Sequence, residues 1–187
     1  MIKRIFKNLF YYYNARHFLS LGEGTKINPT ASVHRKNLIS IGKHSFIGKW
    51  CHISIVEPGS LSIGNFVCIS PYVKILGGDH NFFTVGKYWL PIDDPINLPI
   101  RIEDDTMIGM DAMILKGVTI GEGAVIGAKA LVTKSILPYT IAIGNPAKMV
   151  NLRFNVSDLK DHIDKIQSAY QVDHLLELYK ANGLLNK

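Results

Sequence analysis

The sequence has few cysteines and no long hydrophobic run. Its only cysteines, Cys51 and Cys68, are too few for a disulfide scaffold or a four-cysteine zinc site. No stretch of about 18 apolar residues occurs, so no transmembrane helix is predicted. Asn8, Asn14 and Arg16 interrupt the apolar N-terminus, and no small-residue cleavage site follows, which argues against a secretory signal. We therefore expect a cytoplasmic protein.

The composition is that of a folded chain with a basic balance. Apolar residues make up 47% of the 187 residues and charged residues 19%, which excludes intrinsic disorder. The formal net charge of +6 is compatible with nucleic acid, an anionic membrane surface or a polyanionic small ligand. The central region lacks basic residues interleaved with aromatic ones, so we expect no nucleic-acid partner.

Aliphatic residues recur every six positions through the middle of the chain. The longest register is Ile102, Ile108, Ile114, Ile120, Ile126 and Val132. Three shorter registers precede it: Ile27, Val33 and Ile39; Ile41, Ile47 and Ile53; Ile63, Ile69 and Ile75. Small or β-branched residues often follow four positions later: Ser45, Cys51, Val67, Val73, Thr106, Ala112, Val118, Ala124 and Ala130. A period of six fits a short strand and a tight turn, and three such units close a triangular coil of about 18 residues. A β-sandwich is the alternative, but six consecutive matches would then be accidental.

Two interruptions break this period. The spacing from Ile53 to Ile63 is ten, which predicts a bulge at a corner over residues 57–60. Between Ile75 and Ile102 lies a long segment, residues 77–100, which contains Asp79, His80, Tyr88 and Trp89. Long loops inside compact repeats commonly carry function, so we expect this loop to protrude and to hold part of the site.

The two ends follow a helical period instead. Residues 1–20 contain an apolar stripe made of Ile2, Ile5, Phe6, Leu9, Phe10 and Tyr13. Such a helix either caps the first coil or lies on a membrane surface. The C-terminal part, residues 151–187, predicts a helix that begins near Ser157 as its N-cap and a shorter one from Val172 to Ala181. The apolar stripe of the first of these helices is Leu159, Ile163, Ile166 and Tyr170. Residues 21–150 form the repeat domain between them.

Three motifs add a family resemblance. They are Gly77-Gly78-Asp79-His80, then Val132-Thr133-Lys134 with Pro138-Tyr139, and finally Gly144-Asn145-Pro146-Ala147-Lys148. From about Ile27 to Lys148 the chain resembles the hexapeptide-repeat acyltransferases, in particular their sugar and xenobiotic O-acetyltransferase branch. The resemblance implies a mainly β fold, a left-handed parallel β-helix. Only the resemblance supports that hand, because parallel crossovers are normally right-handed.

The resemblance also implies a catalytic base. His80 lies where the family has a loop histidine that removes the proton of the acceptor hydroxyl, a task that suits a neutral imidazole. Asp79 is a candidate to orient the ring or to contact substrate, although an ordinary loop role is equally compatible with its position. The other histidines are His17, His34, His44, His52, His162 and His174, and we assign them to the surface or to local packing. We expect His44 and His52 at outward corners. No His-x-x-x-His spacing occurs, so no metal is expected.

The co-substrate implied by the resemblance is acetyl-CoA. Met110 and Ala128, 18 residues apart, correspond to positions that offer backbone contacts in successive coils. Thr133 and Lys134 correspond to contacts near the pantetheine arm and the phosphates, and Lys148 to the nucleotide end. Arg153 is a further phosphate candidate without a family match. The alternative for each lysine is a solvated surface charge.

The acceptor side departs from the family pattern. Met107 stands where tryptophan is common, and Lys49 or Trp50 lies roughly where related enzymes have a sugar-binding asparagine. Lys49 is suited to a phosphate or carboxylate, and Trp50 to stacking on a sugar ring. Trp89 in the long loop is another stacking candidate, with packing as the alternative.

These observations together predict a homotrimeric, cytoplasmic acetyltransferase that uses acetyl-CoA. Its expected acceptor contains sugar and belongs to surface-polysaccharide synthesis, either capsule or lipopolysaccharide. An N-acetyltransferase of an amino sugar nucleotide is the second hypothesis, and a xenobiotic acetyltransferase the third. The rivals outside this class are a β-helix scaffold without catalysis and a carbonic-anhydrase-like enzyme with a metal between subunits. Weak contact of the N-terminal helix with a membrane stays open.

Overall fold

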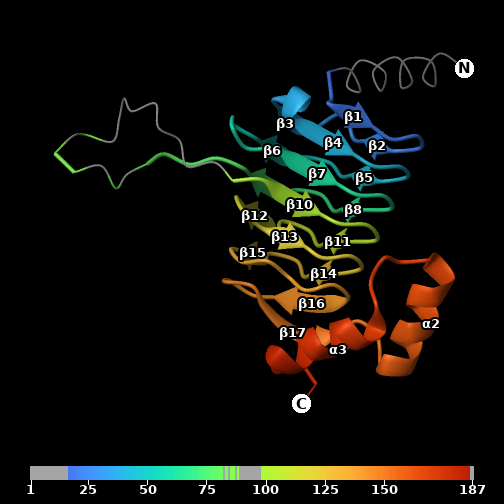
Figure 1. Ribbon diagram of the computed structural model, residues 1–187. Coiled ribbons are helices and arrows are strands. Elements are labelled where there is room, and N and C mark those ends of the chain that lie inside the picture. The colour runs from blue at the N-terminus through green and yellow to red at the C-terminus, as the bar shows by residue number, and fades with distance from the viewer. Residues whose placement is uncertain (1–16, 82, 84, 87, 89–97, 186–187) are drawn as a thin grey trace, which may run out of the picture.

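The computed structural model describes residues 17–81, 83, 85–86, 88 and 98–185, and in them the chain winds into a stack of three-sided coils (Figure 1). The expected N-terminal helix falls in residues 1–16, outside the described part. The strands are β1 (Ser20–Leu21), β2 (Lys26–Ile27), β3 (Ser32–His34), β4 (Ile39–Ile41), β5 (Phe46–Ile47), β6 (His52–Ser54), β7 (Leu61–Ile63), β8 (Cys68–Ile69), β9 (Lys74–Leu76), β10 (Ile100–Ile102), β11 (Met107–Ile108), β12 (Met113–Leu115), β13 (Thr119–Ile120), β14 (Val125–Ile126), β15 (Leu131–Val132), β16 (Thr140–Ile143) and β17 (Lys148–Leu152). The helices are the short 3-10 helix η1 (Lys36–Leu38), α2 (Val156–Ile166) and α3 (Val172–Ala181).

Three parallel sheets form the sides of the stack. Sheet A has the order β1-β4-β7-β10-β13, sheet B the order β2-β5-β8-β11-β14-β16-β17, and sheet C the order β3-β6-β9-β12-β15. Each of the five coils contributes one strand to each sheet, so the first coil is β1–β3 and the fifth β13–β15. All the pairings are parallel except that of β16 with β17, which is antiparallel. The mainly β, parallel architecture predicted from the repeat is therefore confirmed.

The six-residue period defines the core. All six aliphatic residues from Ile102 to Val132 are buried, and so are the small residues that follow four positions later, such as Thr106 and Ala112. Aliphatic residues of successive coils lie in register: Ile63 pairs with Ile102, which pairs with Ile120. Burial of each such side chain contributes roughly 1.5–3 kcal/mol, so a continuous column of them stabilises the stack.

The corners between the sheets depend on left-handed backbone. We call them the AB, BC and CA corners after the sheets they join. A positive φ occurs at the AB corner in His44 and at the BC corner in Trp50, at 54° and 60°. Close stacking imposes a second demand: a Cβ on Gly109 would lie 2.5 Å from the backbone nitrogen of Ala128. Glycine is therefore required where one coil rests directly on the next.

The coil interruptions occur where the spacing predicts them. Residues 57–60 fall between β6 and β7, at the CA corner. The long segment leaves the same corner after β9, and the chain returns at β10. The described part of this segment projects away from the stack (Figure 1).

Three details of the sequence-based picture are wrong. The N-cap of α2 is Asn155, whose side-chain oxygen accepts a hydrogen bond from the backbone N–H of Asp158 at 2.8 Å, instead of Ser157. Ile166 is 45% exposed, because α2 ends there and the buried stripe reduces to Leu159 and Ile163. His52 lies within strand β6 of sheet C and not at a corner.

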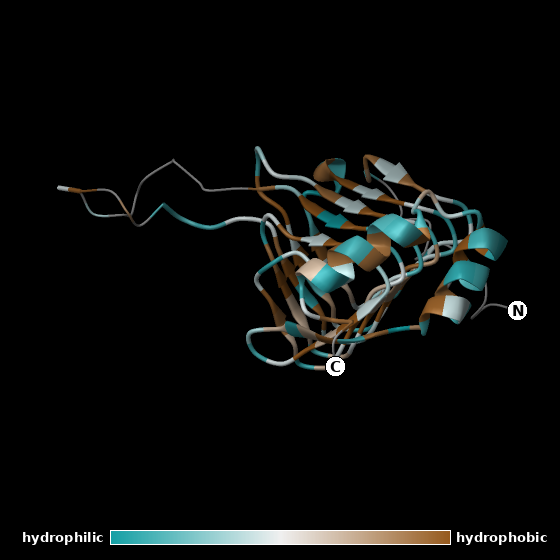
Figure 2. Cartoon of the chain, turned by 60° about the horizontal axis from the view of Figure 1, so that its bottom comes forward, coloured by the Kyte–Doolittle hydropathy of each residue, from teal (hydrophilic) through white to brown (hydrophobic). Residues whose placement is uncertain are grey.

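The C-terminal helices cover the last coil. Their own small core consists of Tyr139, Leu159, Ile163, Leu175 and Tyr179. Apolar residues of α2 and α3 gather on one side of each helix, and hydrophilic residues cover the other side (Figure 2). The strand β17 leads to these helices and was not predicted, because a single antiparallel strand does not continue the six-residue period. The predicted helix from Val172 to Ala181 is confirmed as α3.

Candidate active site

The segment that carries His80 leaves the stack immediately after β9. Gly77 still follows the ladder, since its N–H donates to the carbonyl oxygen of Ser54 at 2.8 Å. A Cβ there would lie 2.7 Å from Cδ1 of Ile55, so the exit is tight. His80 is exposed just beyond it, at the CA corner. The resemblance predicts this exit of a loop histidine from the coil.

Asp79 fixes the first residues of the loop to the next coil. Its Oδ2 atom lies 3.0 Å from Nζ of Lys116, and its Oδ1 atom accepts a hydrogen bond from the backbone N–H of His80 at 2.9 Å. The hydrogen bond from Lys116 holds the pKa of Asp79 below its ordinary value. Asp79 is thus a positioning residue for the backbone of His80. Lys116 was missed in the sequence, although its spacing of 18 from Lys134 places both at one corner of successive coils.

Met110 and Ala128 lie at the BC corner of the fourth and fifth coils, as the spacing predicts. The two coils are joined there, because the N–H of Lys129 donates to the carbonyl oxygen of Met110 at 2.8 Å. Both residues are exposed. Within the described residues, no protein acceptor binds the N–H of either residue.

Two other coils have proline at the turn position that Met110 and Ala128 occupy. Pro29 and Pro71 occupy the equivalent position in the first and third coils, where the next residue again has a left-handed or turn conformation. Proline has no N–H, so the fold does not use a donor at this position. The amides of Met110 and Ala128 are therefore available to a ligand without loss to the fold.

The residues predicted to contact the pantetheine arm and the phosphates lie on two sides of the fifth coil. Thr133 and Lys134 follow β15 at the CA corner, one coil beyond Lys116, and both are exposed. Lys148 begins β17, opposite Ile143 of β16, and is also exposed. The loop before it rests on Leu131, whose N–H donates to the carbonyl oxygen of Gly144 at 3.0 Å. The fold thus places these three residues around the end of sheet C.

Arg153 is engaged elsewhere. Its guanidinium lies 2.6 Å from Oδ2 of Asp105 and donates to the carbonyl oxygen of Gly123 at 3.0 Å, at the AB corner. It also lies over the ring of Phe154, 4.9 Å from the centroid. These contacts attach the C-terminal helices to the coil, so the structure assigns Arg153 a stabilising role in place of the proposed phosphate contact.

Two predicted acceptor residues, Lys49 and Trp50, lie on the far side of sheet C from His80, whereas a third, Asp79, is adjacent to it. Lys49 and Trp50 form the BC corner of the second coil, and both are exposed. The backbone N–H of Trp50 donates to Oγ1 of Thr30 at 3.1 Å, which leaves the indole at the surface. His80 departs from the CA corner, so one chain does not bring the predicted base and Trp50 to the same edge. Trp89 lies outside the described residues.

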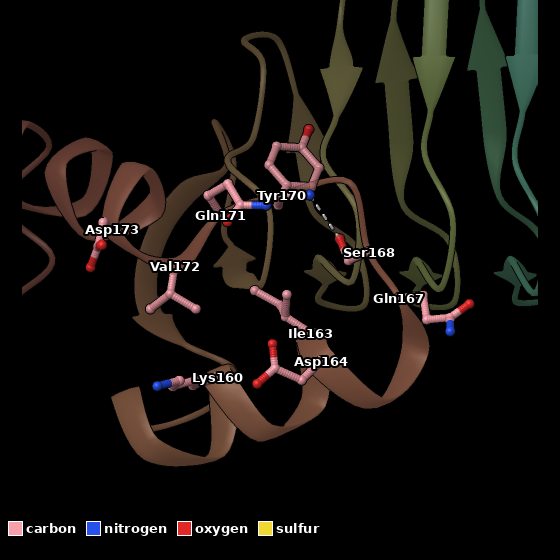
Figure 3. A pocket seen from close by; sticks show the side chains of 9 residues that line it. All are labelled: Lys160, Ile163, Asp164, Gln167, Ser168, Tyr170, Gln171, Val172 and Asp173. Carbon is pink, nitrogen blue, oxygen red and sulfur yellow. Dashed lines mark hydrogen bonds between the residues drawn. The ribbon is translucent and has the colours of Figure 1, made fainter.

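Three pockets of the described surface lie near the C-terminal helices, and no predicted site residue lines these three. One is bounded by α2 and the start of α3, where Lys160, Asp164 and Tyr170 surround it (Figure 3). Within the described residues, no group of three or more histidine, cysteine, aspartate or glutamate side chains could hold a metal ion. The described part also has no helix long and apolar enough to cross a membrane. The candidate site residues that the structure describes are exposed, and all but Lys148 lie at the two corners that border sheet C.

A family model and several relatives match this chain. Residues 99–134 match the model "Bacterial transferase hexapeptide (six repeats)". The Schizosaccharomyces pombe protein C18B11.09c, whose name describes an acetyltransferase, is 39% identical over 113 residues, which are 60% of this chain and 52% of that protein. Chloramphenicol acetyltransferase of Agrobacterium fabrum is 48% identical over 74 residues, 40% of this chain and 33% of the enzyme. The chain thus spans about half the length, or less, of the curated relatives it matches.

Solved structures agree with the fold. The hexapeptide-repeat acetyltransferase VCA0836 of Vibrio cholerae is 28% identical, with a TM-score of 0.69 over 77% of this chain and 80% of that one. The same protein has also been solved in complex with acetyl coenzyme A. The N-acyltransferase AntD of Bacillus cereus, at 20% identity and a TM-score of 0.63 over 84% of this chain and 96% of that one, shares the fold. These matches confirm the resemblance of this chain to the hexapeptide-repeat acyltransferases.

Proposed function

We propose that this protein is an acetyl-CoA-dependent acetyltransferase with His80 as general base. The observation that carries the proposal is the placement of His80 where the chain leaves the CA corner. Beyond this exit, in the fourth and fifth coils, lie the unpaired amides of Met110 and Ala128 and the cationic side chain of Lys134. The acetyl-CoA complex of the Vibrio cholerae relative supports the choice of donor.

The reaction follows from these groups. His80 removes the proton of an acceptor hydroxyl while the oxygen attacks the carbonyl carbon of the thioester. An amide N–H of Met110 or Ala128 of a neighbouring chain stabilises the oxyanion that forms, because within one chain these amides lie at the BC corner and His80 leaves from the CA corner. When the intermediate collapses, the carbon–sulfur bond breaks, and the proton held by His80 passes to the departing thiolate. Thr133, Lys134 and Lys148 hold the pantetheine arm and the phosphates of the donor.

The proposed acceptor contains sugar, and the proposed process is O-acetylation during surface-polysaccharide synthesis in the cytoplasm. Lys49 and Trp50 are the proposed contacts, one for an anionic group and one for a sugar ring, with Trp89 as a further candidate. N-acetyl transfer is the second hypothesis. It is favoured by a 42% identity over 72 residues with tetrahydropyridine-dicarboxylate N-acetyltransferase of Staphylococcus aureus, which covers 38% of this chain and 30% of that enzyme. His80 would remove a proton from nitrogen in the same way.

We also propose that the protein is a homotrimer. The hand proposed for its β-helix is left, as the resemblance implies. The outer face of sheet B carries an apolar stripe, since Phe46, Cys68, Met107, Val125 and Ile141 are in register on successive strands. Phe46 and Met107 are 41% and 43% exposed in the single chain. An exposed stripe of this kind is characteristic of an association surface. The resemblance implies that the donor lies between adjacent chains of such a trimer, so His80 would act on a donor bound at the BC corner of a neighbouring chain.

Substitution of the base tests the reaction. His80→Ala should lower kcat by roughly 10²–10⁴-fold, the usual contribution of general acid–base catalysis, while acetyl-CoA binding changes little. Thiol release gives kcat, and calorimetry gives the affinity for the donor. His44→Ala, at the AB corner, is the matched control and should keep the full rate. A His80→Ala enzyme with near wild-type turnover would contradict the role of the base.

Phe46→Asp tests the trimer. A charge on the sheet B stripe should convert a particle of three chains into monomers, as measured by light scattering. Reaction with a maleimide gives an independent readout, because Cys68 is exposed in the single chain and Cys51 is buried. Cys68 should react slowly in the wild-type trimer and quickly in Phe46→Asp, whereas Cys51 should stay unreactive in both. A wild-type monomer with a reactive Cys68 would sink the proposal.

A further inference from the structure

The outer face of sheet C changes character at the exit of the loop. In the fourth and fifth coils its outward residues are apolar and half-buried, as in Met113, Leu115 and Leu131. In the first two coils they are polar: Ser32, His34, His52 and Ser54. Leu76 of β9 lies in register with Ser54 on one side and Leu115 on the other, directly before the exit. The donor residues proposed above and these polar residues therefore lie on opposite sides of the exit.

Two histidines meet on the polar half. The rings of His34 and His52 come from adjacent strands, with centroids 5.2 Å apart and an interplanar angle of 57°. Oγ of Ser32 lies 2.9 Å from Nε2 of His34. His52 pairs in register with Ser32 on one side and Lys74 on the other, so three nitrogen-bearing side chains cluster on three successive strands. Each neutral imidazole can donate one N–H and an imidazolium two, which suits an anionic oxygen.

The surrounding charge has the same sign. From residue 26 to residue 76 the sequence holds six lysines and arginines and one acidic residue, Glu57. Glu57 lies 4.0 Å from Arg35 at the CA corner. Nζ of Lys74 is 2.7 Å from Oδ1 of Asp111, which lies at the BC corner of the fourth coil. Four of the six basic residues lie on sheet C or at its two corners: Arg35, Lys36, Lys49 and Lys74. Their charge attracts anions to the face that the histidines occupy.

We infer that the outer face of sheet C in the first three coils binds an anionic group of the acceptor, a carboxylate or a phosphate, through His34, His52 and Lys74. The inference rests on the proposed function, whose acceptor it narrows to an acidic or phosphorylated saccharide. Strands in a sheet lie about 4.8 Å apart, so His52 and His34 are about one and two strand spacings from the strand that leads to His80. An anion held by these histidines would lie on the same sheet from which the His80 segment departs. Lys49 lies beside this surface, at the BC corner of the same coil as His52.

Nuclear magnetic resonance of the histidine rings tests the inference without any need for turnover. The full chain is titrated with glucose, glucuronic acid or glucose 1-phosphate at constant ionic strength. The ring signals of His34 and His52 should shift saturably with one or both anionic sugars and stay unchanged with glucose. A response to only one of them identifies the carboxylate or the phosphate as the source. His44, which stacks on Phe66 at 5.3 Å at the opposite AB corner, is the internal control and should not shift.

Variants sharpen the result. His52→Gln, an exposed substitution, should weaken binding of the responding sugar at least tenfold, as expected for one lost charge-assisted hydrogen bond, and His44→Gln should not. No shift with either anion, equal shifts with glucose, or equal shifts of His44 would overturn the inference. His80→Ala should lower kcat of acetyl transfer by the roughly 10²–10⁴-fold expected above and keep the shifts. If the shifts occur while no acceptor supports thiol release, the anion site stands and the proposed function fails.

Discussion

The coils before and after the long loop share one backbone and differ in what they present outward. Residues 26–76 hold six basic residues and one acidic residue, whereas residues 100–132 hold three basic and five acidic ones. Both parts bury the same aliphatic column, since Ile53 and Ile114 are fully buried. The buried core is thus alike in the two halves, and the halves differ in their outward residues. Charge segregation of this kind points to different ligands for the two halves.

The corners make the same point in a single backbone conformation. The left-handed residues of the early coils include the exposed aromatics Trp50, Phe66 and Tyr72, whereas the late coils have Asp111 and Lys129 there. A left-handed conformation favours glycine or asparagine, and an aromatic side chain at this position costs free energy. The fold requires the conformation and not the side chain. Aromatics retained at an unfavourable and exposed position are therefore candidates for binding or association.

The largest expected effect comes from a methyl group placed between coils in each half. A Cβ on Gly48 would lie 2.7 Å from the nitrogen of Pro71, and one on Gly109 would lie 2.5 Å from the nitrogen of Ala128. Gly48→Ala and Gly109→Ala should each destabilise the protein by about 1–3 kcal/mol, because backbone must move apart. Thermal unfolding measures the loss in both variants.

Donor binding separates these two variants. Gly109→Ala displaces the amide of Ala128 and should weaken acetyl-CoA binding, whereas Gly48→Ala should bind acetyl-CoA normally at a temperature where both are folded. Calorimetric titration makes the comparison. Equal donor affinity of the two variants would show that the late coils are not the donor half.

A smaller effect is expected at the boundary between the halves. Lys116→Met removes the partner of Asp79 and should lower kcat/KM about tenfold, within the range that misplacement of a catalytic group costs. Lys116 holds the pKa of Asp79 below its ordinary value. The ion pair of Asp79 with Lys116, called the anchor here, is therefore intact above the usual aspartate range and is lost as the pH falls through the lowered pKa. In the wild type, the amide signal of His80 should report that transition. In Lys116→Met the transition should move to higher pH, and an unmoved transition would contradict the anchor.

The smallest effect is expected at Trp50. Trp50→Asn places a residue that tolerates positive φ at an exposed corner and should change stability by less than about 1 kcal/mol, in the favourable direction. The acceptor KM should rise while acetyl-CoA affinity stays constant. Tyr72→Asn is the control at the next coil. A marked loss of stability in Trp50→Asn would mean that the indole packs instead of binding.

Much of the fold was predictable because the repeat is local. Each six-residue unit predicts which residue is buried, and all six aliphatic residues of the register from Ile102 to Val132 are buried. The C-terminal attachment was not predictable. Arg153 and Asp105 are 48 residues apart in sequence, and the sequence around each residue does not predict their ion pair. Likewise, Asp79 and Lys116 are 37 residues apart in sequence and form an ion pair. Most of the residues between them belong to the long loop, so the six-residue period does not predict that the two side chains meet.

The sequence by itself determined the column of buried aliphatic residues, the exit of a loop histidine and the common corner of Met110 and Ala128, because a fixed period converts position in the chain into position around the coil. The tertiary structure alone decided which outward residues face each other across strands. The first two coils are offset by 20 residues, since Ser32 pairs with His52 (52 − 32 = 20) and η1 lengthens the corner between β3 and β4. His34 and His52, 18 residues apart in sequence, are therefore diagonal in register, and their contact depends on the side-chain directions of two strands. The same holds for the separation of Trp50 from His80 across sheet C, since only the closed triangle shows that they occupy different edges.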